Sequence, residues 1–242
     1  MSEPADPRRD ELTRNLGAVR ERIRAACARA GRSSESVTLT VVTKFFPASD
    51  VRLLADLGVR HVGENRHQEA VPKAAECADL DLSWHFIGGL QSNKAAAVAG
   101  YADVVESVDR PKVLRGLSSG AREHDRFLDV LVQVDLDQAS PDGVRGSGRA
   151  GARPESVREV AQAVLETDRL RLRGVMAVAP LGVDPRPAFA RLAEVAEQVR
   201  VLEPSATWVS AGMSNDLEAA VEAGATHVRI GSAVLGARPS GR

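Results

Sequence analysis

Three features that would point to particular classes of protein are scarce in this 242-residue sequence. Only two cysteines are present, Cys27 and Cys77, and they form no metal-binding motif, so we expect the reducing cytosol and not a disulfide framework. The net charge is −1, with 32 Lys and Arg residues against 33 Asp and Glu, which gives no electrostatic case for nucleic acid. No apolar run is long enough to span a bilayer, and the polar start does not resemble a signal peptide. A soluble, cytoplasmic protein that binds neither nucleic acid nor membranes is therefore expected.

Metal ligands are also poorly grouped. His61 and His67 are separated by a segment that contains Glu64, and Glu69 follows shortly after. Because His61 belongs to a predicted strand, the two histidines do not share a helix face, as a metal-binding pair would. No metal site is expected.

What the sequence does contain is a regular alternation of strand-like and helix-like segments. A helix is predicted over residues 7–31, where apolar residues recur at three-to-four spacing and Gly31 ends the pattern. Eight short apolar segments then read as strands, each followed by a helical segment: Val37–Lys44, Val59–Gly63, Ser83–Ile87, Val104–Val108, Leu128–Val134, Leu172–Val178, Thr207–Ser210 and Thr226–Ile230.

This alternation predicts an α/β fold, a single closed (β/α)8 barrel over about residues 37–237 with an extra N-terminal helix. A doubly wound open sheet is the alternative. The even spacing of the strands disfavours it, and no linker or change of composition marks a second domain.

The first strand, Val37–Lys44, ends in a lysine although its other residues predict burial on both faces. The ammonium group of Lys44 must reach water, find an anion or lose its charge through a lowered pKa. One interpretation is a lysine that leaves the sheet for solvent. The other is an amine held at the rim where parallel strands end, which is where barrel enzymes keep their chemistry.

The ends of the last two strands carry groups that suit an anion. Ser210–Asp216 is a turn of mostly small residues that runs into a helix, where backbone N–H groups would cradle an anion. Arg229–Ser232 adds a cation, a glycine and a hydroxyl. Either alone could be an ordinary helix cap or a surface arginine, but together they favour a phosphate site, because barrels commonly bind phosphate at these two loops. A phosphate site facing Lys44 suits a phosphorylated aldehyde bound as a Schiff base.

Five motifs, each at the end of a different predicted strand, resemble the pyridoxal phosphate homeostasis protein family. They occur in the family's order over roughly residues 37–237. They are Val42-Thr43-Lys44, Gly63-Glu64-Asn65 with Gln68-Glu69, Trp84-His85-Phe86-Ile87-Gly88 with Leu90-Gln91-Ser92-Asn93-Lys94, Gly212-Met213-Ser214-Asn215-Asp216 with Glu218-Ala219-Ala220, and Val228-Arg229-Ile230-Gly231-Ser232.

The resemblance implies a fold-type III barrel that binds pyridoxal 5′-phosphate (PLP), like the N-terminal domain of alanine racemase. It implies that Lys44 holds PLP as a Schiff base and that Arg229 faces the pyridine nitrogen. By the same resemblance, Asn65 lies near the ring, and the phosphate is held by Ser214, Gly231 and Ser232.

The sequence departs from the family in a few places. Phe45-Phe46 replaces a more polar pair, Gly89 and Ala211 replace larger residues, and the loop Asp135–Arg153 is longer and richer in arginine than usual. None of these changes removes a predicted ligand, so they concern loop shape and partner contacts.

Four other residues are weighed outside the predicted site. His85 and the two tryptophans, Trp84 and Trp208, are interpreted as packing residues of the core, with the histidine hydrogen-bonded. Lys94 opposes a helix dipole in the first turn, so it is either a rim contact for an anion or a solvated lysine.

Three functions are compatible with a lysine and a phosphate site. One is a barrel enzyme of the aldolase type, in which the lysine attacks the carbonyl group of a sugar phosphate. This hypothesis does not account for the five motifs. Racemisation needs a second acid or base, which in alanine racemases is a tyrosine supplied with a C-terminal domain and a partner subunit. Here the sequence ends about a dozen residues after the eighth strand, and its one tyrosine, Tyr101, precedes the fourth strand.

An arginine at the pyridine nitrogen would also weaken the ring as an electron sink. The favoured hypothesis is therefore an intracellular PLP-binding protein for homeostasis and delivery, without dedicated catalytic turnover, and a PLP-dependent racemase-like enzyme is the alternative. Apo forms of PLP-dependent enzymes are the expected acceptors, and a monomer is expected.

Overall fold

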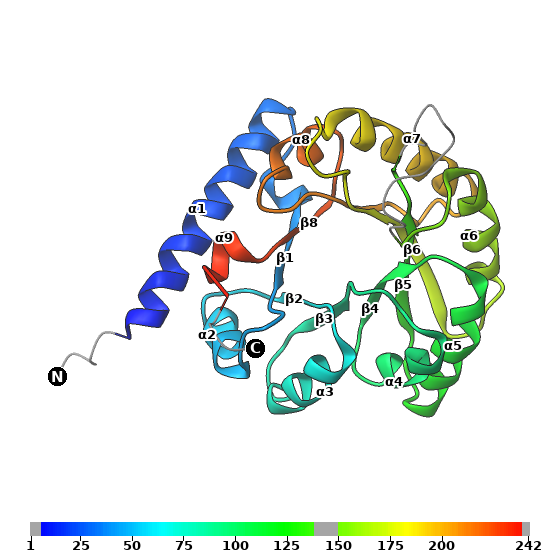
Figure 1. Cartoon of the computed structure of the whole chain (residues 1–242), viewed down its shortest axis with the longest axis horizontal. Helices are drawn as coiled ribbons and strands as arrows, with labels where there is room; N and C mark the ends of the chain where they lie inside the picture. The colour runs from blue at the N-terminus through cyan, green and yellow to red at the C-terminus, as the bar shows by residue number, and fades with distance from the viewer. Residues whose placement is uncertain (1–5, 138–149, 239–242) are drawn as a thin grey trace.

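The computed structural model describes residues 6–137 and 150–238, and in it eight parallel strands close into a barrel in chain order (Figure 1). The strands are β1 (Thr38–Val42), β2 (His61–Glu64), β3 (Ser83–Phe86), β4 (Val104–Val108), β5 (Leu128–Val134), β6 (Leu170–Ala177), β7 (Trp208–Ser210) and β8 (His227–Ile230). Closure comes from the pairing of β8 with β1, in which Leu39 lies opposite Val228. The predicted (β/α)8 barrel is confirmed.

Helices surround the barrel (Figure 1). They are α1 (Pro7–Arg29), α2 (Ala48–Asp56), α3 (His67–Glu76), α4 (Ala95–Ala99), α5 (Leu114–Glu123), α6 (Val157–Leu165), α7 (Arg186–Leu202), α8 (Leu217–Glu222) and α9 (Ser232–Leu235). None of the helices in the described part of the chain is long and apolar enough to cross a membrane.

Two boundaries differ from the sequence-based expectation in ways that affect the site. β1 ends at Val42, because Thr43–Phe46 form a turn closed by a 3.1 Å hydrogen bond from the Phe46 N–H to the Thr43 carbonyl oxygen. A helix that the sequence also predicts over Asn215–Ala223 extends over Leu217–Glu222. Burial on both faces of the first strand also holds only from Thr40 onward.

The extra N-terminal helix, α1, covers one side of the barrel next to α8 and α9 (Figure 1). Its apolar positions are buried against them: Leu12, Leu16, Val19, Ile23, Ala26 and Cys27. Burying each of the larger side chains contributes about 1.5–3 kcal/mol. Arg22 adds a bidentate ion pair to Glu218, with N–O distances of 2.7 and 2.9 Å. This helix therefore fixes the position of α8, which follows the loop after β7.

The interior of the barrel contains a chain of polar side chains. His61 Nδ1 lies 3.0 Å from His85 Nε2, and His85 Nδ1 lies 2.7 Å from Glu106 Oε1. The other carboxylate oxygen of Glu106 accepts a 2.6 Å hydrogen bond from the Ser210 hydroxyl and lies 3.6 Å from the guanidinium of Arg229. Hydrogen-bonded and 1% exposed, His85 is the core histidine that the sequence indicated.

These contacts keep Glu106 ionised inside the protein. Burial acts to raise the pKa of Glu106, but the hydrogen bonds from His85 and Ser210 and the positive charges of His85 and Arg229 lower it to about 2. His227 lies beside this chain, with its ring 6.4 Å from His85 and 4.4 Å from Trp208.

Two of the interior histidines should make the fold sensitive to acid. Burial, together with the charge of His85, lowers the pKa of His61 to about 4, and burial lowers the pKa of His227 to about 4 against the opposing charge of Glu106. A histidine with a lowered pKa binds fewer protons in the folded protein than in the unfolded chain. Its stabilising contribution is complete above pH 6.5 and is lost as the pH falls toward 4.

We expect the free energy of unfolding to fall between pH 6.5 and pH 5, by up to about 1.4 kcal/mol per pH unit for each histidine. His227→Gln should make this slope shallower, measured by urea unfolding at a series of pH values. His124→Gln, at an exposed position, is the matched control and should leave the slope unchanged. An unchanged slope in His227→Gln would contradict the assignment.

Candidate functional site

All six residues predicted to bind the cofactor line one cavity of about 390 Å³. They are Lys44, Asn65, Ser214, Arg229, Gly231 and Ser232. They follow or end β1, β2, β7 and β8, so the cavity lies at the end of the barrel where parallel strands terminate. Its volume is within the usual range for a small-molecule site.

Lys44 is the second residue of the turn Thr43–Phe46 and is half-buried. Burial lowers the pKa of its amine, and the nearby charges of Arg238 and Arg66 lower it further. Glu64 and Glu69 oppose this effect without reversing it. A larger fraction of the amine is therefore neutral and nucleophilic at neutral pH than for a solvated lysine.

Arg229 projects from β8 and is 4% exposed. Its Nη1 donates to the Ser210 hydroxyl at 2.6 Å, and its Nη2 donates to the Ala177 carbonyl oxygen at 2.8 Å. Glu106 supplies the buried counter-charge. The guanidinium is thus fixed from β6, β7 and β4 while it lines the cavity.

The loops after β7 and β8 bring two hydroxyls together. Ser214 Oγ and Ser232 Oγ lie 3.3 Å apart. Arg22 of α1 holds the Ser214 carbonyl oxygen at 2.9 Å. The N–H of Met213 is already used, because it donates to Asp216 Oδ1 at 2.6 Å. An anion here would therefore rely on the two hydroxyls and on other N–H groups of these loops.

Asn65 follows β2 at the rim of the cavity. The chain after β3 passes so close to it that a Cβ at Gly88 would lie 1.9 Å from the Asn65 carbonyl oxygen. Only glycine fits at position 88, whereas a Cβ at Gly89 would meet no atom within 4 Å.

Apolar and aromatic side chains form the rest of the cavity wall, notably Phe45, Phe46, Ile87 and Met176. The lining residues that were not predicted from the sequence include Leu181, which is 76% exposed, Gly236 and Arg238. Leu181 lies three residues beyond the predicted sixth strand, Leu172–Val178, so a longer window past the end of that strand would have included it. Nothing in the sequence pattern indicates that the segment carrying Arg238 turns back over the cavity.

This set of groups fits a phosphorylated aromatic aldehyde. The cavity combines an amine of lowered pKa, apolar and aromatic wall residues, a buried guanidinium and a pair of hydroxyls. Residues 6–137 and 150–238 contain no group of three or more His, Cys, Asp or Glu residues placed to hold a metal ion.

Several other residues weighed in the sequence lie away from this cavity. Neither Lys94 nor Tyr101 is among the residues that line it. The ring of Tyr101 instead stacks on His67, with 5.8 Å between ring centroids. Trp84 is a buried core residue, and Trp208 is partly buried against the cluster of Val104, Leu131 and Met176, so both are packing residues as expected. Most of the loop Asp135–Arg153 lies outside the described residues.

The chain is similar to known proteins over almost its whole length. The model of the family "Alanine racemase, N-terminal domain" matches residues 14–239. The pyridoxal phosphate homeostasis protein of Mycobacterium tuberculosis is 43% identical, and the match covers 96% of this chain and 94% of that protein.

Solved structures agree with this relationship. PipY of Synechococcus elongatus, in a structure described as having PLP bound, is 33% identical with a TM-score of 0.78, over 93% of this chain and all of that one. Alanine racemase from Corynebacterium glutamicum has a TM-score of 0.67 at 15% identity, over 96% of this chain and 63% of that one, which shows a shared fold. The sequence motifs, the closed barrel and these likenesses agree, and the chain belongs to the pyridoxal phosphate homeostasis protein family, built on the alanine racemase N-terminal domain.

Proposed function

We propose that this protein binds PLP reversibly through Lys44 and serves intracellular PLP homeostasis and delivery. The observation that carries the proposal is the single cavity that joins the amine of Lys44, the buried guanidinium of Arg229 and the hydroxyls of Ser214 and Ser232. Family membership and the PLP-bound structure described for PipY support it.

Each polar group of the cavity has a distinct part in this proposal. When bound, PLP supplies an aldehyde whose carbon is attacked by the neutral amine of Lys44, with loss of water. Arg229 faces the pyridine nitrogen and, as a permanent cation, disfavours protonation there. Ser214, Ser232 and the backbone at Gly231 hold the phosphate, and Asn65 lies near the ring.

Storage is favoured over catalysis by what the cavity wall contains. Its described residues include one carboxylate, Asp216, and no histidine, cysteine or tyrosine. Asp216 Oδ1 accepts the Met213 N–H, so this carboxylate is hydrogen-bonded to its own loop. A racemase would need a second acid or base on the face of the substrate opposite Lys44.

Transfer of PLP to apo-enzymes follows from the reversibility of the bond to Lys44, since an incoming amine displaces Lys44.

Lys44→Ala should abolish the covalent bond to PLP. We expect the visible absorbance of the PLP-loaded protein to disappear, along with the mass that borohydride fixes to the chain. Lys94→Ala is the matched control, because this lysine lies outside the cavity, and it should retain both signals. Undiminished trapping at another lysine in Lys44→Ala would refute the assignment.

Ser214→Ala combined with Ser232→Ala should weaken PLP binding by at least about tenfold, because hydrogen bonds to a charged group contribute roughly 1.5–3 kcal/mol each. Unphosphorylated pyridoxal carries no phosphate and should bind the double variant as it binds the wild type. Equilibrium titration of both ligands measures the difference. Equal weakening of the two would mean that the phosphate lies elsewhere.

The loaded protein should activate an apo-acceptor enzyme without converting amino acids. Incubation with L-alanine and other L-amino acids should yield no D-isomer or keto acid above the level of Lys44→Ala, as followed by chiral chromatography. Formation of either product at about 1 s⁻¹ or faster, an ordinary enzymatic rate, would favour the racemase-like alternative.

A further inference from the structure

The residue that follows Lys44 has an unusual backbone conformation. Phe45 has φ = 72°, in the left-handed region. It is the third residue of the turn Thr43–Phe46, and a positive φ at that position is typical of a type II turn, where glycine is usual. A phenylalanine held there is strained, because its Cβ crowds the following carbonyl oxygen. Other contacts must hold the turn in this form.

Helix α3 provides those contacts on both sides of Lys44. Glu69 Oε2 accepts a 3.2 Å hydrogen bond from the Phe45 N–H. One helical turn later, Lys73 Nζ donates a 2.8 Å hydrogen bond to the Thr43 carbonyl oxygen. The carbonyl of the residue before Lys44 and the N–H of the residue after it are therefore both tied to one face of one helix.

Lys73 is itself firmly held. It is 6% exposed and lies 2.5 Å from Glu64 Oε1, which also accepts a 2.6 Å hydrogen bond from the Thr43 hydroxyl. Breaking such a buried pair is strongly destabilising. Glu69, with a side chain that is 26% exposed, is the member of the arrangement that can be changed with less effect on folding.

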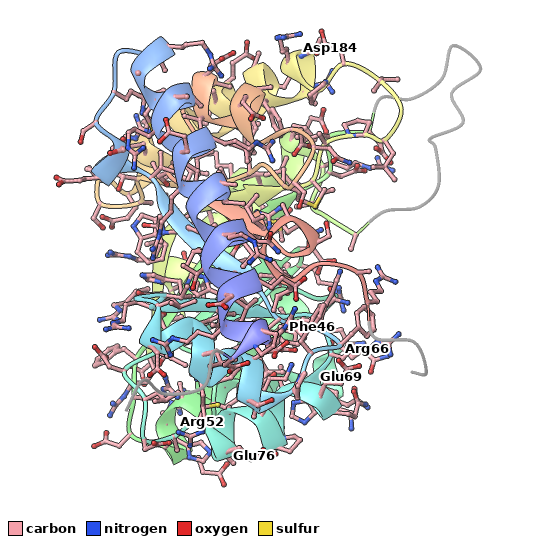
Figure 2. The ribbon with its side chains drawn as sticks, turned by 90° about the vertical axis from the view of Figure 1, so that its left-hand side faces the viewer. Phe46, Arg52, Arg66, Glu69, Glu76 and Asp184 are labelled. Atoms are coloured by element: carbon pink, nitrogen blue, oxygen red, sulfur yellow. The ribbon has the colours of Figure 1, made fainter. Side chains whose placement is uncertain are left out.

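The side chain of Phe45 explains why a larger residue stands where glycine would relieve the strain. Its ring lines the cavity beside Lys44. The guanidinium groups of Arg66 and Arg238 lie over it, 5.3 and 4.7 Å from the ring centroid. Arg66 also pairs with Glu69 at 3.3 Å, and both side chains are labelled in Figure 2.

We propose that Glu69 is a positioning residue for Lys44, which acts by holding the strained turn in the conformation that directs the amine into the cavity. This inference rests on the proposed function, because it concerns the reaction of that amine with PLP. Glu69 touches neither the cavity nor the reacting atoms. Its effect passes through the Phe45 N–H.

Two substitutions separate the hydrogen bond from the charge of Glu69. Glu69→Gln keeps an oxygen that can accept the Phe45 N–H but loses the negative charge, whereas Glu69→Ala loses both. The charge of Glu69 raises the pKa of Lys44, so both variants should lower that pKa to the same extent. Competitive acetylation of Lys44 as a function of pH measures this in the protein without PLP. Only Glu69→Ala should also make the fully deprotonated amine react more slowly with PLP.

We expect that loss of rate to be about five- to thirtyfold, the factor that corresponds to the penalty of one left-handed residue. It is measured by stopped-flow absorbance at a pH above the pKa of Lys44. Glu76→Ala, an exposed glutamate at the end of the same helix, is the matched control and should react at the wild-type rate.

A second pair of variants tests whether strain is the cause. Phe45→Gly removes both the strain and the ring, and Phe45→Ala removes the ring but keeps the strain. Glu69→Ala should therefore lose its effect in the Phe45→Gly background and keep it in the Phe45→Ala background. In each background, the rate with Glu69→Ala is compared with the rate of the same Phe45 variant that keeps Glu69. The loss of the ring affects both rates equally.

Two results would overturn the inference: a wild-type rate in Glu69→Ala, or an equal loss of rate in both Phe45 backgrounds. Absence of any covalent PLP on the wild-type protein would refute the proposed function instead. In that case the acetylation rate of deprotonated Lys44 tests the positioning role without PLP. It should be altered in Glu69→Ala and unaltered in Glu69→Gln, and equal rates would overturn the role.

Discussion

A permanent positive charge inside the barrel is the constraint on which the interior depends. Arg229 cannot lose its proton at physiological pH, so burial obliges the surrounding strands to supply acceptors and a counter-ion. Glu106 provides the charge, while Ser210 and the Ala177 carbonyl oxygen fix the orientation. Glu106 in turn is held by His85. The polar interior is therefore a consequence of placing a guanidinium at the cavity, and the ring-facing role proposed for Arg229 gives that placement a purpose.

A second buried charge pair lies outside the barrel and fixes the other side of the same cavity. Glu64 and Lys73 pair between β2 and α3, and Lys73 holds the carbonyl of Thr43. Neither pair needs to stabilise the fold more than apolar residues would. Their common effect is geometric, because each fixes one group, Arg229 or the turn that carries Lys44, relative to the rest of the barrel. The two ends of a bound aromatic aldehyde would then meet groups with defined positions.

The sequence predicted the barrel, and that Lys44 and Arg229 lie at one of its rims, because both follow from periodic features, whereas the part of Asn65 was expected only from the resemblance to the family. Apolar runs ended by polar residues mark strands, and the ends of parallel strands meet at one rim, so Lys44 and Arg229 could be assigned to it from the chain alone. Contacts that depend on side-chain reach were not predictable. Glu106 lies on β4 and meets Arg229 across the barrel from β8. Phe45 is no turn former, so the turn that shortens β1 left no signal.

Reversible delivery requires the site both to capture PLP and to release it. The covalent bond and the noncovalent contacts have different parts in these two steps. A covalent bond to Lys44 discriminates for an aldehyde, but once an acceptor amine displaces the lysine, only noncovalent contacts retain the ligand. Those contacts include a guanidinium fixed in the barrel and a pair of serine hydroxyls, of which Ser232 is exposed. An exposed phosphate contact exchanges with water more readily than a buried one. Under the proposed function, the lysine therefore governs which ligand is captured, and the openness of the phosphate side governs how readily it leaves.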